Sequence, residues 1–390
     1  MSTPKYIDIH VIQTLPFSNV NRDDTGSPKT VEFGGVERTR VSSQSWKRVV
    51  RQHVEEAVGG ETVRTRRVVV GVAERLIKQG WEKSEAEAAG VQIALSAGKK
   101  ISLKQEKDES DEVVLTTNVL LLLPESGIDE LAALADEHRE VILAEAKKAK
   151  KLTGMKPKLP SERINEILSR RSATINLFGR MVAELPGANV DGAVQVAHAF
   201  TTHGTAVEYD FFTAVDDIEQ KLDLPGSGYM DTALFSAGTF YRYANVNLTD
   251  LLRNLDQDTD LARVLVKTFL DGFITTVPSG KQNATAAVTL PDLVHVTVRD
   301  DRPVSLANAF EAPVGGGDGF VRKSAHRLDS HAGAIAELLG ESHVLFSAHT
   351  TTPGAMPKNA EGWGHLGVNA RSFEKLIDDA VDVALPGGRS

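Results

Sequence analysis

The sequence contains no cysteine among its 390 residues. This absence excludes disulfide frameworks, thiolate zinc sites, iron–sulfur clusters and thiol nucleophiles. Long apolar runs are missing too, because the longest one, around residues 119–123, is far shorter than the roughly 20 residues that span a bilayer. The N-terminal stretch MSTPKYIDIH has neither the basic segment nor the apolar core of a signal peptide. We therefore expect a globular protein located in the cytoplasm.

Basic residues are in the minority. The chain has 44 Lys and Arg against 53 Asp and Glu, and its formal net charge is −9. As an average, this value argues against a protein that binds a nucleic-acid backbone. The charge is unevenly distributed, however, because residues 144–171 carry a local net charge of +6 and residues 22–51 carry +3. The remaining residues therefore carry −18, and nucleic-acid binding stays a possible function.

Hydrophobic periodicity predicts an α+β fold. Strands and helices are expected in the order strand, helix, strand, strand, helix, strand, at about 6–12, 43–58, 190–202, 240–248, 259–275 and 293–298. A helical stretch at about 61–189, with helices near 84–97, 128–151 and 161–170, follows the first helix, and an excursion at 204–235 separates the middle strands. Without these two additions the order is βαββαβ, which is the ferredoxin-like order that RNA-recognition modules share.

The first predicted helix carries a candidate binding site. Its face away from the apolar stripe holds Gln44, Lys47, Arg48 and Arg51. Ser42 or Ser43 provides the N-cap, and free N–H groups together with the helix dipole favour an anion at this end. The pattern predicts a phosphate-binding helix N-terminus. A solvated amphipathic helix with an ordinary serine cap fits the same pattern and is the commoner case.

Residues that suggest other chemistry are weaker candidates. His198 and His203 would point to opposite faces of a strand, so they predict no metal site. Three pairs of adjacent aspartates could hold the Mg²⁺ of a nuclease, although such pairs are more often turn and cap residues. These pairs are Asp23–Asp24, Asp216–Asp217 and Asp300–Asp301. The glycines at 315–319 lack a following lysine and predict a flexible loop, so neither a cofactor nor a metal ion is expected.

Several sequence blocks together resemble one known family. They are NRDD at 21–24, FGG at 33–35, RVSSQSWKR at 40–48, GRM at 179–181, VDGA at 190–193, AHA at 197–199, TTH at 201–203, FTAVDD at 212–217, FYRYAN at 240–245 and SLANAF at 305–310. In this order, over about residues 5–311, they resemble the CasC family. Members of this family are the backbone subunits of Cascade, the type I-E CRISPR effector complex.

The resemblance implies a hand-shaped, non-catalytic subunit with an RRM-like palm (1–58, 197–204 and 240–390, including the C-terminal segment), helical fingers (59–196) and a β-hairpin thumb (205–239). About six copies would stack along one CRISPR RNA, kink it at regular intervals and present it for pairing with target DNA in antiviral defence. The implied partners are the CRISPR RNA, target DNA, other copies of the chain and the remaining Cascade subunits. Those subunits are the large subunit, the small subunits and the subunits that bind the 5′ and 3′ ends of the guide.

The resemblance also assigns guide-binding residues by position. These are Arg22, Lys29, Ser42, Gln44, Lys47, Arg48, Arg51, Met181, Met230 and Lys281. The two methionines would act as apolar wedges at kinked nucleotides, whereas without the resemblance both would be interpreted as gap-fillers in the core.

Two further hypotheses concern target DNA and catalysis. The local charge of +6 suggests that four lysines contact target DNA: Lys147, Lys148, Lys150 and Lys151. The alternative function is a metal-dependent ribonuclease, similar to type III backbone subunits, that would use Asp23 or Asp24.

Overall fold

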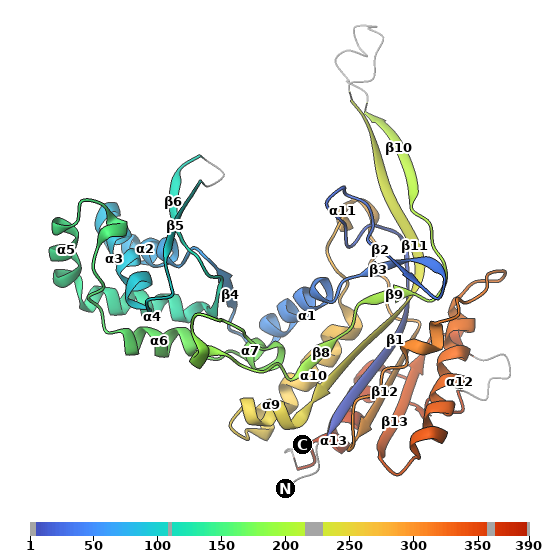
Figure 1. Cartoon of the computed structure of the whole chain (residues 1–390). Coiled ribbons are helices and arrows are strands. Elements are labelled where there is room, and N and C mark those ends of the chain that lie inside the picture. Colours follow the sequence, from blue (N-terminus) through green and yellow to red (C-terminus); the bar gives the residue numbers. More distant parts are fainter. Residues whose placement is uncertain (1–4, 108–110, 215–228, 357–362, 388–390) are drawn as a thin grey trace, which may run out of the picture. The chain divides into compact units, whose positions relative to one another are not determined.

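The computed structural model describes residues 5–107, 111–214, 229–356 and 363–387 (Figure 1). The chain forms two compact units, residues 1–53 with 194–390 and residues 54–193. Both units combine helices and strands, which confirms the expected α+β class. In the part of the chain that is described, no helix is both long enough and apolar enough to cross a membrane.

A ten-stranded sheet forms the centre of the first unit. Its strands are β1 (Tyr6–Ser18), β2 (Thr30–Phe33), β3 (Val36–Val41), β8 (Val194–Val196), β9 (Ala199–Thr201), β10 (Glu208–Ala214), β11 (Tyr229–Asn247), β12 (Leu293–Arg299), β13 (Val344–Thr351) and β14 (Val368–Asn369). Their order is β14-β13-β12-β1-β11-β9-β3-β2, and both β8 and β10 pair with β11. Strand β1 lies antiparallel between β11 and β12. The ribbon formed by β10 and β11 extends away from the sheet (Figure 1).

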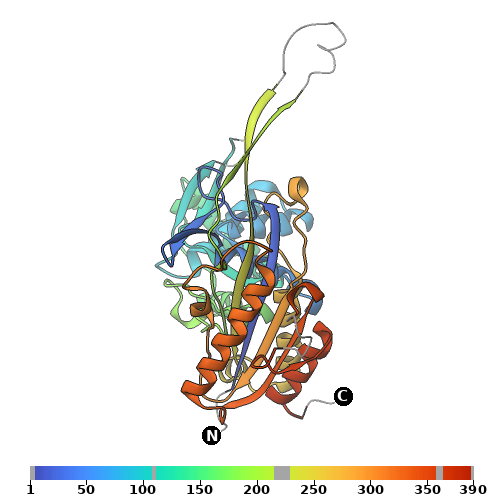
Figure 2. The ribbon, with the colours of Figure 1, turned by 90° about the vertical axis from the view of Figure 1, so that its right-hand side faces the viewer.

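Helices cover both faces of this sheet. They are α1 (Ser43–Val58), α9 (Leu248–Asn254), α10 (Thr259–Thr275), α11 (Gln282–Thr285), α12 (Val321–Leu339) and α13 (Phe373–Ala384), with 3₁₀ turns at Ala307–Phe310 and Pro353–Ala355. Successive residues of a strand point to opposite faces. Tyr241 and Tyr243 pack in one core cluster with Leu328 of α12, whereas the guanidinium of Arg242 lies over the rings of Trp46 in α1 and Phe273 in α10. Helix α12 therefore covers one face (Figure 2), and α1 and α10 cover the other.

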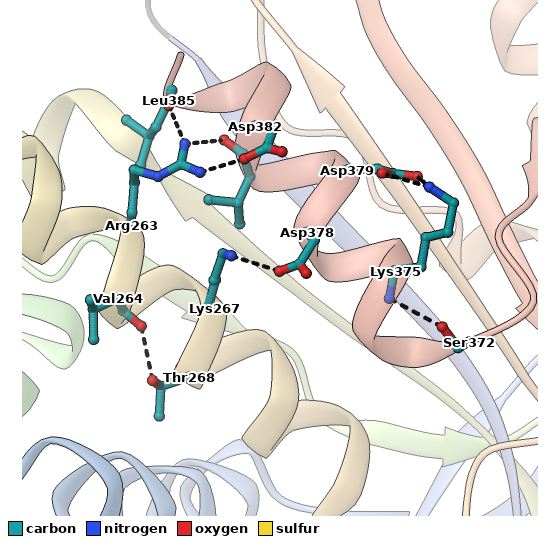
Figure 3. A network of polar contacts seen from close by, with 11 residues as sticks. Arg263, Val264, Lys267, Thr268, Ser372, Lys375, Asp378, Asp379, Asp382 and Leu385 are labelled. Atoms are coloured by element: carbon teal, nitrogen blue, oxygen red, sulfur yellow. Dashed lines mark hydrogen bonds and ion pairs between the residues drawn. The ribbon is translucent and has the colours of Figure 1, made fainter. Parts of the chain in front are cut away.

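Polar contacts hold α13 beside α10 (Figure 3). The guanidinium of Arg263 binds the carboxylate of Asp382. The ammonium of Lys267 lies 2.6 Å from Asp378. Both carboxylates and Lys267 are exposed to solvent, so we expect each pair to add little stability by itself.

The second unit has its own hydrophobic core. Its strands are β4 (Thr62–Thr65), β5 (Leu103–Lys107), β6 (Val113–Thr117) and β7 (Leu121–Pro124). Its helices are α2 (Val68–Lys78), α3 (Lys83–Ser96), α4 (Glu125–Glu137), α5 (Arg139–Lys148), α6 (Ser161–Ser169) and α7 (Ala173–Phe178), with 3₁₀ turns at Leu152–Gly154 and Pro186–Ala188. Small and branched apolar side chains of α2, α3 and α4 fill this core, together with Trp81.

Three expected elements differ from those observed. The strand expected at 6–12 continues to Ser18. Pro16 lies in a register shift between Leu15 and Ser18, where its missing N–H removes no hydrogen bond between regularly paired residues, so the strand can continue past it. The helix expected at 128–151 is two helices, α4 and α5, which meet at His138. The ring of His138 binds the carbonyl of Leu134 at 2.9 Å, at the point where the helical turn is interrupted.

The strand expected at 190–202 is divided into β8 and β9. The N–H of Ala197, which lies between them, still binds the carbonyl of Tyr243. The predicted fingers boundary of 59–196 includes β8, whose three residues pair with β11 in the first unit. The Asp216–Asp217 pair lies outside the described residues.

Candidate nucleic-acid interface

The side chain of Asn21 joins the loop after β1 to the start of α1. Its Oδ1 accepts hydrogen bonds from the backbone N–H of Ser42 at 2.8 Å and from the Ser42 hydroxyl at 2.7 Å. In the same loop, the N–H of Lys29 binds the carbonyl of Asn21, and the carbonyl of Lys29 accepts the N–H of Arg40. These contacts, which we call the Asn21–Ser42 clasp, fix the loop that carries Arg22 and Lys29 against β3 and α1.

The N-terminal N–H groups of α1 are partly occupied. The N–H of Ser42 is bound by Asn21, and the N–H of Ser43 donates to Nδ1 of His198 at 3.1 Å. The expectation that free N–H groups here bind a phosphate is therefore wrong for these two groups. Ser42 is also only 8% exposed and already donates its hydroxyl proton to Asn21, so its evident contribution is to position the loop. These two N–H groups are therefore not available to a ligand in this arrangement.

Helix α1 presents its polar residues away from the sheet. Trp46 is buried beneath the guanidinium of Arg242, 3.6 Å from its ring centroid, and this contact sets the rotation of the helix. Gln44 and Arg48 are exposed as a result, and Lys47 is half-buried. Burial lowers the pKa of the Lys47 ammonium. Among the described residues no carboxylate forms an ion pair with Lys47 or Arg48, so both charges remain available to an anion.

Lys281 lies beside the same loop. Gly280 approaches the backbone so closely that a Cβ atom there would be 2.5 Å from the carbonyl oxygen of Val20. Lys281 itself is exposed and has a φ of 54°. The pKa of Asp231 in β11 is lowered, first by the N–H of Thr232 and also by the charge of Lys281. Lys281 is therefore close both to the loop that carries Arg22 and to the ribbon.

The predicted wedge Met230 lies on the ribbon. It pairs with Thr213 and shares a face with Tyr209 and Phe211, because directly opposed residues lie on one side of a two-stranded ribbon. The Met230 side chain is 61% exposed. This exposure excludes the interpretation of Met230 as a gap-filler in the core.

The other predicted wedge, Met181, belongs to the second unit. The preceding residue, Arg180, is buried and donates hydrogen bonds to four carbonyls, those of Leu122, Ser169, Arg170 and Ala188. Gly179 has a φ of 79°, and a Cβ atom at this position would be 2.7 Å from the backbone nitrogen of Gly192. The anchored arginine and the tight turn leave Met181 87% exposed, so it is not a core residue either.

The four predicted DNA-binding lysines are also in the second unit. Lys147 and Lys148 form the last turn of α5, where the helix dipole favours cations, and Lys150 and Lys151 follow the helix. All four are exposed. In the described segments, no carboxylate pairs with any of them.

Asp23 is used within its own loop. Its Oδ1 accepts hydrogen bonds from the hydroxyl of Thr25 at 2.7 Å and from the N–H groups of Thr25 and Ser27, each at 2.9 Å. These donors, the Thr25 hydroxyl above all, lower the pKa of Asp23. The geometry is that of an Asx-turn. No group of three or more His, Asp or Glu side chains arranged to hold a metal ion occurs among the residues that the structure describes.

Other candidate motifs also have contacts inside the fold. The carboxylates of the third aspartate pair bind neighbours: Asp300 with His343 at 2.8 Å and Asp301 with Arg299 at 2.9 Å. Nε2 of His203 accepts the N–H of Thr239, which makes it a structural histidine. The glycine loop at 315–319 directs the carbonyl of Gly316 toward the ammonium of Lys323 at 2.8 Å, a geometry that suits a cation instead of a phosphate.

Three residues that the sequence analysis did not select help to build this interface. Asn21 forms the clasp, His198 caps α1, and Arg40 lies close enough to lower the pKa of His198. Arg38, by contrast, adds to the basic charge of residues 22–51 but is buried and binds the carbonyls of Phe33, Thr201 and Glu311. Asn21, His198 and Arg40 all lie within the sequence blocks that resemble the family. Their place in these blocks was the signal from which the sequence analysis could have selected them.

Comparisons with known proteins give the family. A family model described as "CT1975-like protein" matches residues 7–378. A comparison with curated proteins gives no match. Among solved structures, a chain of a "CRISPR RNA-guided surveillance complex, pre-nicking" is 51% identical, with a TM-score of 0.89, and the alignment covers 97% of this chain and 100% of that one. A chain of a "CRISPR RNA-guided surveillance complex" is 44% identical, with a TM-score of 0.80 and the same coverage. The chain belongs to the CT1975-like, or CasC-like, protein family.

Proposed function

We propose that the chain is a backbone subunit of a CRISPR RNA-guided surveillance complex and that it holds the guide RNA at the interface around the Asn21–Ser42 clasp. Two similar chains from such complexes, aligned over 97% of the sequence, support the assignment. The observation that carries the binding site is the gathering of cationic side chains without ion-pair partners around one clasp. Those for which no carboxylate partner occurs among the described residues are Arg22, Lys29, Lys47, Arg48 and Lys281.

The finer architecture belongs to the same proposal. Strands β12, β1, β11 and β9 lie in this order, and α1 and α10 cover one face, which is the arrangement that the order βαββαβ gives in an RRM-like domain. We propose that this part, including β8, is the palm, that residues 59–193 contribute the fingers, and that the β10–β11 ribbon is the thumb. The exposed Met181 and Met230 support their proposed role as wedges at kinked nucleotides, and a type I-E complex is the assembly in which we place the chain.

In this mechanism the protein contacts the backbone of the guide and leaves sequence recognition to base pairing. Lysine and arginine neutralise phosphates and release counterions, so binding should weaken as the salt concentration rises. The proposed role is non-catalytic, and the use of Asp23 Oδ1 as the acceptor of three hydrogen bonds inside its own loop supports a structural role for this residue. The ribonuclease alternative is therefore not favoured. A cytoplasmic location remains a prediction from the sequence.

The double variant Lys47→Ala/Arg51→Ala tests the binding site. We expect purified protein to lose its RNA, because two cations of the proposed contact surface are removed from one face of α1. The measurement is the ratio of absorbance at 260 and 280 nm, followed by electrophoresis of the extracted RNA.

The matched control is Arg253→Ala/Lys375→Ala, which removes the same charge from exposed positions in α9 and α13. The control should retain RNA of wild-type length. Retention of RNA by the Lys47→Ala/Arg51→Ala variant would remove the proposed site.

A further inference from the structure

We infer that His198 is a further guide-binding residue, which contacts the RNA backbone through its Nε2–H group. This inference rests on the proposed function, because it adds a contact to the same interface. The sequence analysis considered this residue only as a possible metal ligand.

The capping contact determines which ring nitrogen of His198 carries the proton. Nδ1 accepts the N–H of Ser43 at 3.1 Å, so Nδ1 is unprotonated in this arrangement. The neutral ring must then carry its proton on Nε2. The side chain of His198 is exposed, and in the described part of the chain Nε2 has no hydrogen-bond partner. The ring therefore presents one N–H donor of fixed direction at the edge of the interface.

The charges around His198 keep it neutral and attract an anion. Partial desolvation of the largely exposed ring lowers its pKa first, and the charges of Arg40 and Lys29 lower the pKa further. Both cations belong to segments joined by the clasp, since the N–H of Arg40 binds the carbonyl of Lys29 at 2.8 Å. A neutral donor near two cations can bind an oxygen of the RNA backbone without adding a third positive charge. The acceptor is either a phosphate oxygen or a ribose 2′-hydroxyl.

Three variants separate the two contacts of the ring. In His198→Asn, Oδ1 occupies the position of Nδ1 and can still accept the Ser43 N–H, but the Nε2–H donor is lost. In His198→Gln, the amide reaches the position of Nε2 and restores a donor without the cap. His198→Ala removes both contacts. The dissociation constant of each full-length variant for single-stranded guide RNA is measured at several salt concentrations.

We expect His198→Ala and His198→Asn to weaken binding by about tenfold, the usual value of one hydrogen bond to a charged group, and His198→Gln to recover most of it. The slope of log K against log salt should not change, because a neutral donor releases no counterion. Lys47→Ala is the reference, and its slope should fall by about 0.7. A DNA oligonucleotide of the same sequence identifies the acceptor: the effect of His198→Asn persists with DNA for a phosphate and disappears for a 2′-hydroxyl.

Wild-type affinity for RNA in His198→Asn, with a loss in His198→Ala, would overturn the inference, because His198 would then be only a cap. Equal affinity in all variants would also overturn it. Failure of the wild-type protein to bind RNA would instead contradict the proposed function. Thermal melting of each variant shows whether the fold is retained, and His198→Asn should melt as the wild type does.

Discussion

Buried polar residues connect the sheet to the helix that carries the interface. The guanidinium of Arg242 lies 3.6 Å from the ring centroid of Trp46 and 4.6 Å from that of Phe273, and it binds Oε1 of Gln13 and the carbonyl of Phe273. Burial lowers its pKa to about 9. This side chain thus connects α1 and α10 to the strands. It therefore helps to determine which face of α1 is exposed to solvent.

Asp8 is a buried carboxyl group whose pKa is raised toward neutrality. It is fully buried in β1, where it accepts hydrogen bonds from the hydroxyl of Tyr243 at 2.7 Å and from the N–H of Val304 at 3.1 Å. Burial raises the pKa of Asp8 from 3.8 to about 7, although the Tyr243 hydroxyl opposes the shift. Between about pH 4 and pH 7 the folded protein therefore binds this proton more tightly than the unfolded chain does. The contribution of Asp8 to stability is present at low pH and is lost as the pH rises through this range.

Asp8→Asn should remove this dependence. Relative to the wild type, the variant should gain stability between pH 4.5 and pH 8, with a change on the order of 4 kcal/mol at most. The buried His10 and His295, whose pKa values are lowered, titrate with the opposite sign, but both proteins contain them and the difference cancels their effect. Urea unfolding at several pH values measures this difference. Parallel pH profiles for the two proteins would contradict the prediction.

Residue identity and spacing predicted the exposed face of α1 but not the contacts around it. Gln44 and Arg48 follow directly from helical periodicity, which fixes the face opposite Trp46. The bond between Ser43 and His198 joins residues 155 positions apart, and no local pattern contains that information. The burial of Arg38 could not be predicted from the sequence either, because the sequence does not show whether an arginine in a basic segment binds water or three carbonyl groups.

Elements with a strong, uninterrupted pattern were predicted best. Helix α10 occupies the expected residues 259–275, and α1 occupies the expected residues 43–58. Errors occurred where tertiary contacts decide the outcome, as at the bulge that contains Pro16 and the break at His138. The break at His138 has neither glycine nor proline to mark it. At the bulge, Pro16 favours the end of a strand, and only the pairing with β11 shows that the strand continues past it.

The four lysines at the end of α5 provide a test of the proposed contact with target DNA. Replacing Lys147, Lys148, Lys150 and Lys151 by glutamate should weaken binding of target DNA and flatten its salt dependence, because four proposed phosphate contacts become repulsive. Affinity for the guide RNA should change little, because the proposed guide contacts of the clasp are made by other residues. The measurement is a titration of assembled complex with target DNA at several salt concentrations. Unchanged DNA affinity across that range would exclude these lysines from the DNA path.

For the whole molecule, the average charge conceals the distribution that matters. The net charge of −9 combines two basic segments with an acidic remainder. The structure refines this distribution, because Arg38 is buried and contributes nothing to the basic surface. Under the proposed function, we expect the acidic remainder to limit indiscriminate binding to polyanions.

The proposed function predicts that several copies of the chain assemble on one RNA. If copies stack along one guide, native mass spectrometry of the complex should show several copies of the 42.1 kDa chain with a single RNA of defined length. The Lys47→Ala/Arg51→Ala variant should appear as monomer without RNA, because the guide holds the copies in register. A wild-type preparation consisting only of RNA-free monomer would contradict the stacked arrangement.

One face of the sheet has a consequence for how such a system acquires new targets. If the palm is RRM-like, as we propose, Tyr241 and Tyr243 lie on the strand face that binds bases in open RNA-recognition sheets, and α12 and the ring of Phe310 cover this face. Helix α12 and Phe310 therefore block a surface that could otherwise distinguish one nucleotide from another. Under the proposed function, the sequence of the RNA alone determines which target the complex binds. A cell can therefore redirect the complex by transcribing a different guide, without changing a single residue of this protein.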